Sequence, residues 1–277
     1  MQRDATDEHR PAPKGVNPNV PNMARMWDYQ LGGKDNFAAD RRAAEAVNAA
    51  LTEAGAPTGR EAARDNRALI HRMVRYLASE AGIRQFLDLG SGLPSMGNVH
   101  EVAHAAAPEA RVVYVDYDPV VVVHGRAILA GGDNVTVLQG DLREPQQVLR
   151  EVEEQQLLDL DQPVAVLLIA MLHCLYDEED PWSIAAQFRD AIPPGSYLAL
   201  AHLTHETHPD GAAALARTVK EMGATTPLVP RSRQAVERFF GDFELVEPGL
   251  VYSHEWRPDS VLVSAARWML AAIGRKQ

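Results

Sequence analysis

The segment FLDLGSGLP, residues 86–94, decides the fold, because it joins a short apolar run to two closely spaced glycines. The apolar part has the length of a strand. Gly90 and Gly92 allow the backbone to approach a ligand where a Cβ atom would clash. Asp88 lies beside this glycine turn, and its carboxylate can hold a cationic amino group. The segment therefore predicts a buried strand whose carboxyl end faces a ligand.

From this strand onward, apolar runs of strand length alternate with helical segments. Further strands are predicted at residues 111–116, 135–141, 164–172 and 197–203, and helices at residues 98–107, 121–129, 145–158 and 181–192. This order implies a parallel sheet with helices on both faces. The continuous apolar run at 164–172 fits a strand buried on both sides. Segments that begin at Phe243 and Arg267 are expected to form a closing strand pair.

The chain before the first strand has a different character. Residues 1–22 are polar and contain four prolines, which predicts a flexible arm. Residues 23–84 are mostly helical, with helices over 40–55 and from Arg60 to Gly82. They are expected to form a cap or lid on the sheet-containing core, residues 85–277, in a single structural domain.

Composition excludes several classes of function. The 277 residues carry a formal net charge of −11. Such acidity argues against nucleic acid and against an anionic membrane surface as partners. The single cysteine, Cys174, rules out an intrachain disulfide and a cysteine-built zinc site. His202, His205 and His208 are spaced three apart, but we expect no metal site there. Without a signal-peptide core or an apolar run that could span a membrane, a cytoplasmic protein is expected.

Acidic residues follow three successive strands at the edge where a doubly wound sheet binds its ligands. Asp88 comes first, Asp116 ends the second strand and can accept both hydroxyls of a ribose, and Asp141 ends the third and can accept from an adenine amino group. Three carboxylates around one pocket would repel a pyrophosphate. They suit a cationic cofactor without phosphate, such as S-adenosylmethionine.

Two other nucleotide patterns fit less well. A dinucleotide fingerprint, G-x-G-x-x-G, requires glycine where this chain has Ser95. A P-loop requires Gly-Lys-Ser/Thr after a strand, and this chain has none. A nicotinamide-dependent oxidoreductase is therefore the less favoured alternative, beside a regulatory protein that binds S-adenosylmethionine without catalysis.

Several stretches together carry a resemblance to a known family: FLDLGSGLP, NVHEVA, VVYVDYDP, GDLREP, PPGSYLALAH and, near the start, NMARMWDYQLGGKDNFAAD. From about Pro21 onward the chain resembles the actinobacterial S-adenosylmethionine-dependent methyltransferases, first catalogued as a domain of unknown function. The resemblance implies a class I, Rossmann-like fold of seven strands with an antiparallel last strand. It implies cofactor contacts at Asp88, Gly90, Gly92, Asp116, Asp118 and Asp141. Pro94 replaces the third glycine of the class I pattern.

Further cofactor contacts are expected next to the strand ends and on one helix. The strand-end candidates are Ser91, Tyr117, Gly140, Leu142 and Met171. Asn66 falls on the core-facing stripe of its helix, where a polar group needs a partner. That helix begins near the ligand-binding edge, so Asn66 and Arg67 are site candidates; the alternative for Asn66 is a structural hydrogen bond.

The acceptor side offers fewer candidates. His173 follows the fourth strand and is expected to act as a general base; the alternative is a neutral histidine bonded to backbone. Tyr29 and Lys34 lie in a glycine-containing segment that either folds over the site as a lid or is merely a turn. Tyr176 is a candidate for the substrate pocket. The sequence thus predicts a methyltransferase for a small molecule, and leaves the acceptor and the oligomeric state open.

Overall fold

The computed structural model describes residues 16–94, 97–129, 134–259 and 266–277. Most of the predicted flexible arm, residues 1–15, lies outside the described residues, and so does Ser95. In the part of the chain that is described, each helix is too short or too polar to cross a lipid bilayer.

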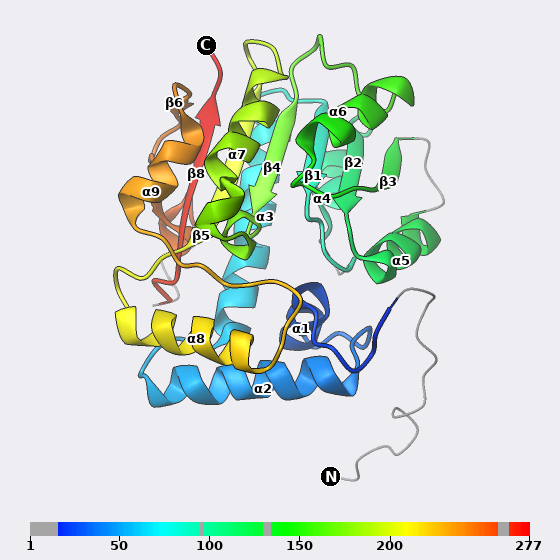
Figure 1. Cartoon of the computed structure of the whole chain (residues 1–277). Coiled ribbons are helices and arrows are strands. Elements are labelled where there is room, and N and C mark those ends of the chain that lie inside the picture. The colour runs from blue at the N-terminus through cyan, green and yellow to red at the C-terminus, as the bar shows by residue number, and fades with distance from the viewer. Residues whose placement is uncertain (1–15, 95–96, 130–133, 260–265) are drawn as a thin grey trace.

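One mixed sheet of eight strands forms the centre of the described chain (Figure 1). Its order is β3 (Val135–Gln139), β2 (Arg111–Asp116), β1 (Gln85–Leu89), β4 (Ala165–Ile169), β5 (Tyr197–Leu203), β8 (Met269–Arg275) and β6 (Glu244–Leu245), with β7 (Val251–Tyr252) also paired to β8. Strands β1 to β5 are parallel, and β8 runs antiparallel to β5. The predicted doubly wound sheet with an antiparallel last strand is confirmed.

The strand order places a switch point at the centre of the sheet. From β1 the chain moves outward to β2 and β3, then returns to β4 on the other side of β1. The connections that leave β1 and β4 therefore diverge, and a crevice opens between their carboxyl ends. Two predicted strands are shorter than expected at this edge: β3 stops at Gln139, and β4 stops at Ile169 because Ala170 adopts a left-handed conformation, with φ of 61°.

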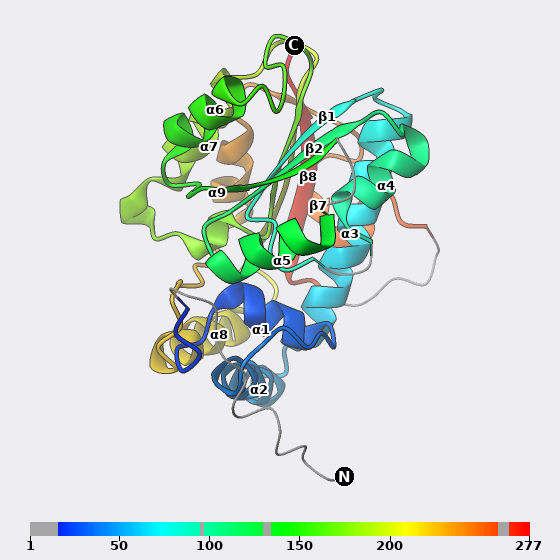
Figure 2. The ribbon, with the colours of Figure 1, turned by 90° about the vertical axis from the view of Figure 1, so that its right-hand side faces the viewer.

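Helices cover both faces of the sheet, as Figure 2 shows edge-on. Successive residues of β1 point to opposite faces: Phe86 joins one apolar core and Leu87 the other. The core around Phe86 lies under α3 (Gly59–Ser79), α4 (Val99–Ala106) and α5 (Pro119–Leu129). The core around Leu87 lies under α6 (Pro145–Glu154), α7 (Pro181–Asp190) and α9 (Arg233–Glu237).

A layer of helices lies beyond the carboxyl ends of the parallel strands (Figure 1). It consists of α1 (Met23–Gln30), α2 (Ala38–Glu53), the first turns of α3, and α8 (Pro209–Glu221). Helix α3 begins with a capping box, in which Thr58 and Glu61 each bond the other's backbone N–H. Helix α8 comes from much later in the chain. It joins this layer because Leu215 and Val219 pack in the core shared with α2, and Gly211 brings its backbone against Ala56. The helical cap is therefore built from two distant parts of the sequence.

The predicted closing pair is present, but its edge strand is divided. Strands β6 and β7 both pair antiparallel with β8, at neighbouring registers. The N–H of Val246 still donates to the carbonyl of Ile273, at 2.8 Å. Pro248 then interrupts the ladder, since it has no N–H to donate. The sheet consequently has eight strands where the family resemblance implies seven.

Candidate active site

A cavity of about 170 Å³ lies between the strand ends and the helical cap. Its floor includes Asp88, the Gly90–Gly92 turn and Asp116, and its roof comes from α1, α2, α3 and α8. The cavity thus occupies the crevice at the switch point of the sheet.

The glycine turn after β1 is tied to β2 and open toward the cavity. The N–H groups of Gly90 and Ser91 both donate to the carbonyl of Val115, at 2.8 and 3.2 Å. Gly90 and Gly92 have φ of 74° and 67°, a conformation that glycine adopts without strain. A Cβ on Gly90 would lie 2.2 Å from the sulfur of Met171, whereas one on Gly92 would meet no atom within 4 Å. The thioether of Met171 therefore packs on the turn, and the side of Gly92 is left for a ligand.

Asp116 braces this turn and keeps a raised pKa. Its carboxylate accepts the N–H of Gly92 and the N–H of Asp118, both at 2.9 Å. Burial raises the pKa of Asp116 to about 6, even though these two bonds favour the ionised form. Asp116 thus holds its strand end in shape and still lacks a full counter-charge.

Asp88 faces Arg67 across the cavity floor. Burial raises the pKa of Asp88 to about 7; the charge of Arg67 opposes this rise and that of Asp116 adds to it. Burial lowers the pKa of Arg67, whose guanidinium donates to the carbonyl of Gly97, at 3.5 Å. Two carboxylates with raised pKa values beside an open glycine turn form a site that favours a cationic ligand.

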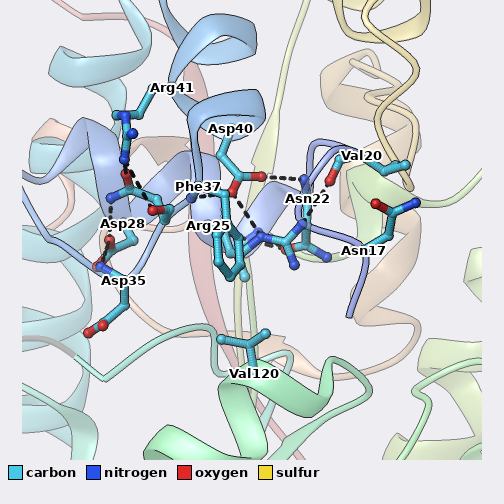
Figure 3. Close-up of polar contacts among 12 residues, drawn as sticks. Asn17, Val20, Asn22, Arg25, Asp28, Asp35, Phe37, Asp40, Arg41 and Val120 are labelled. Carbon is cyan, nitrogen blue, oxygen red and sulfur yellow. Dashed lines mark hydrogen bonds and ion pairs between the residues drawn. The ribbon is translucent and has the colours of Figure 1, made fainter. Parts of the chain in front are cut away.

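Arg25 fastens the cap onto the turn after β2, and Figure 3 shows its guanidinium beside Asp40. Its Nε lies 2.9 Å from Asp40 and its Nη1 lies 3.4 Å from Asp118, and all three side chains are buried. Its Nη2 donates to the carbonyl of Val20, at 2.8 Å. Asn22 caps α1 and donates its backbone N–H to the same Asp40. Sequence reasoning missed this cluster, although its first members fall in the stretch NMARMWDYQLGGKDNFAAD.

Arg231 holds the loop that follows β4, and all five of its N–H donors are used. The guanidinium donates to Asp177 twice, to Nε2 of His202, and to the carbonyls of Leu172 and Leu175, over 2.7–3.0 Å. Its side chain is 4% exposed. The planar fork of arginine suits such convergent acceptors. Sequence reasoning missed Arg231 as well.

His173 lies in this loop and lines the cavity. Its Nδ1 accepts the N–H of Leu203 at 3.2 Å, which leaves the ring proton on Nε2. Burial, with a contribution from Arg231, lowers the pKa of His173 to about 3. A ring with one nitrogen bonded to backbone and the other protonated is a poor general base. The contacts favour the alternative, a neutral histidine bonded to backbone, whose Nε2–H can donate to a ligand.

Most of the expected site residues reach the cavity. The ones that line it are Asn66, Arg67, Asp88, Gly90, Ser91, Gly92, Asp116, Tyr117, Asp118, Met171 and His173. Gly140, Asp141 and Leu142 are not among the described residues that line it. The carboxylate of Asp141 is held by Nε of Arg143, at 2.9 and 3.0 Å, and Leu142 is buried in the core under α6.

The expected lid and pocket residues also lie elsewhere. The hydroxyl of Tyr29 donates to Glu45 on α2, at 2.7 Å, and Tyr176 is half exposed on the loop after β4. Neither they nor Lys34 belong to the described cavity lining. No group of three or more His, Cys, Asp or Glu side chains in the described ranges could hold a metal ion.

Comparisons with known proteins agree with this geometry. Residues 9–277 match the model of a family described as S-adenosyl methyltransferase. A candidate methyltransferase from Thermobifida fusca is 43% identical, with a TM-score of 0.87 over 96% of this chain and 98% of its own. A DUF574 family protein from Streptomyces avermitilis is 37% identical, with a TM-score of 0.85 over 93% and 98%. No curated protein matches the chain.

Proposed function

Since the chain belongs to the S-adenosyl methyltransferase family, we propose that its cavity binds S-adenosylmethionine at the strand edge and presents the methyl group to a small-molecule acceptor. The reaction class and the cofactor follow from the family. The assignment of individual residues and the size of the acceptor are our proposals, and the buried carboxylates beside the open glycine turn support them best.

The residues at the strand edge fit this cofactor. Asp116 can accept the two ribose hydroxyls, and Asp88 can pair with the ammonium group of the methionine end. Arg67 lies opposite Asp88 and can pair with the carboxylate of that end. The raised pKa values of Asp88 and Asp116 support this assignment, because each carboxylate gains a partner when a cation with donor groups enters.

When bound, S-adenosylmethionine supplies a methyl group that its sulfonium has already activated. The protein therefore has to position the acceptor and exclude water, and positioning of this kind contributes about 7–11 kcal/mol. Arg25 and Asn22 hold α1 over the cavity, and the N–H of Thr225 donates to the carbonyl of Pro21 at 3.1 Å, which joins the loop after α8 to the same cover. This cover supports a small acceptor rather than a polymer.

Calorimetric titration of the full chain tests the proposal. We expect S-adenosylmethionine and S-adenosylhomocysteine to bind and NAD not to bind. Asp116→Asn should lower the affinity for S-adenosylmethionine by about 10–100-fold, since a hydrogen bond to a charged group contributes about 1.5–3 kcal/mol. Glu153→Gln, at an exposed position of α6, serves as the matched control and should leave the affinity unchanged. Binding of NAD instead, or equal affinity in both variants, would contradict the assignment.

A further inference from the structure

The cavity continues beyond the strand edge and runs under the cap along α3. Ile70, Asn66, Ala62 and Gly59 all line it, and their spacing of three to four residues places them on one face of that helix. From Ile70 to Gly59 this face spans about 16 Å, at about 1.5 Å per residue. The cavity therefore has two ends, and α3 passes from one to the other.

The end at the sheet is charged, whereas the end under the cap is apolar. Arg67 marks the first end, where it faces Asp88. The second end we call the cap chamber, and its walls are Met26, Val47, Leu51, Leu215, Val219 and Trp268. These side chains come from α1, α2, α8 and the segment before β8, and each is buried.

Gln30 and Asp28, which reach the cavity from α1, are already hydrogen-bonded within the cap. Gln30 and Asn48 exchange two amide hydrogen bonds, at 3.1 and 3.0 Å. The carboxylate of Asp28, which also reaches the cavity, accepts the N–H of Asp35 and the amide of Asn36. An anionic ligand in the chamber would lose its hydration and meet the like charge of Asp28, and burial of an unpaired charge is costly.

Asn66 lies between the two ends and carries an unsatisfied acceptor. The residue is 4% exposed, and its Oδ1 is a buried oxygen without a hydrogen-bond partner. Buried polar atoms in native proteins nearly always have a partner, so such an oxygen in a cavity wall indicates a ligand that donates to it. The donor must be an O–H or N–H group, since Oδ1 can only accept.

We propose that the cap chamber binds the methyl acceptor, and that this acceptor is a compact, uncharged molecule with an apolar ring body and one O–H or N–H group that donates to Oδ1 of Asn66. The identification of this ligand with the acceptor rests on the proposed function. The binding of such a molecule in the chamber does not, because it follows from the apolar walls and the unpaired oxygen alone.

Three bicyclic probes test the chemistry of the chamber in the full chain. Indole has one N–H, indene has the same shape without it, and indole-5-carboxylate adds a charge. We expect indole to bind at least tenfold more tightly than indene, and indole-5-carboxylate not to bind. Titrations with and without saturating S-adenosylhomocysteine should give similar indole affinities, because the probe and the cofactor occupy different ends. Equal affinities for indole and indene, or displacement of indole by S-adenosylhomocysteine, would overturn the proposal.

Two variants locate the probe. Ala62→Leu fills the chamber beside Asn66 and keeps a good helix former. It should therefore lower the affinity for indole at least tenfold and the affinity for S-adenosylmethionine less than threefold. Asn66→Leu removes the acceptor and should abolish the preference for indole over indene, which keeps the proposal testable if Ala62→Leu does not fold. If Asn66→Leu instead lowers the cofactor affinity and keeps the preference for indole over indene, Asn66 contacts the cofactor, and our inference is overturned.

The same titrations separate this inference from the proposed function. If the protein binds S-adenosylmethionine but shows no preference for indole over indene, the proposed function stands and the acceptor site in the cap chamber is rejected. If the protein binds indole with the expected preference but does not bind S-adenosylmethionine, the cap chamber stands as a binding site and the proposed function is rejected.

Discussion

Two buried arginines hold segments that border the cavity, the loop after β4 and the cap, and they do so with different partners. Arg231 binds the loop after β4 through two carbonyls and through Asp177, whose side chain is 61% exposed, and it also donates to His202 on β5. Arg25 binds the cap to β2 through Asp40 and Asp118, whose side chains are only 0% and 5% exposed. The first arginine holds a loop by hydrogen bonds, and the second joins two layers by buried charge.

This difference shows where the molecule keeps uncompensated charge. Arg231 faces one carboxylate that water also solvates, so this ion pair is close to neutral. Arg25 faces two carboxylates that water does not reach, and Asp88 and Asp116 lie at the same strand edge as Asp118. The strand edge at the sheet end of the cavity therefore carries an excess of buried negative charge. A cationic cofactor is drawn to that end, and the apolar cap chamber is left for an uncharged acceptor.

The largest effect is expected when the cap loses its cation. Arg25→Met leaves Asp40 and Asp118 buried without a counter-charge, and we expect a loss of about 3–5 kcal/mol in the free energy of unfolding, measured by urea denaturation. Arg60→Met is the matched control, because its ion pair with Glu45 is long, 3.6 Å, and about half exposed. The control should lose less than about 1 kcal/mol. A loss in Arg25→Met no larger than in the control would remove the distinction between the two arginines.

The next effect concerns the other arginine. Arg231→Lys keeps the charge but loses the fork, so at least one of the Leu172 and Leu175 carbonyls is left unpaired. We expect a loss of about 1–3 kcal/mol in the free energy of unfolding. Arg111→Lys, which loses only an exposed bond to Gln156, should change it by less than about 0.5 kcal/mol. If the loss in free energy of unfolding is larger in Arg231→Lys than in Arg25→Met, hydrogen bonds contribute more than buried charge to the stability of these two contacts.

A smaller effect should follow pH. With a pKa of about 7 in the free protein, Asp88 is mostly protonated at pH 6 and mostly ionised at pH 8. The ammonium group of the cofactor pairs only with the ionised form, so affinity should rise about tenfold over that range, equivalent to about 1.4 kcal/mol. Calorimetric titration at pH 6, 7 and 8 measures this change in the affinity for S-adenosylmethionine. Asp88→Asn should bind more weakly and lose most of the rise; an equal slope in the variant would exclude Asp88 as its source.

The fold was predictable because its signals are local. Strand β2 and strand β5 were placed with their observed ends, since each is a continuous apolar run bounded by charged or turn-forming residues. The glycine turn and Asp116 were placed because strand ends of a parallel sheet meet at one edge. Helix α8 was not assigned to the cap, because its contacts there are with residues far away in sequence, on α2 and at Ala56.

The site was predictable where one residue follows a strand, and not where two distant segments meet. Asp118 was expected at the cofactor, but its contact with Arg25 spans 93 positions, and no local pattern reveals it. Asp141 was expected in the pocket from its place after β3. Its neighbour Arg143 folds back and binds that carboxylate, a competition between two side chains that the sequence does not decide.

The smallest effect tests the expected lid. Tyr29 was expected either in a lid over the site or in a simple turn, and its hydroxyl donates to Glu45 at the exposed surface of the cap. Tyr29→Phe should therefore change the free energy of unfolding by less than about 0.5 kcal/mol and leave S-adenosylmethionine affinity within twofold. Asn22→Ala, on the same helix but at its capping position, should cost about 1 kcal/mol. If Tyr29→Phe instead weakens the cofactor tenfold, α1 must turn when ligand binds, and Arg25 would then hold only one of two positions of the cap.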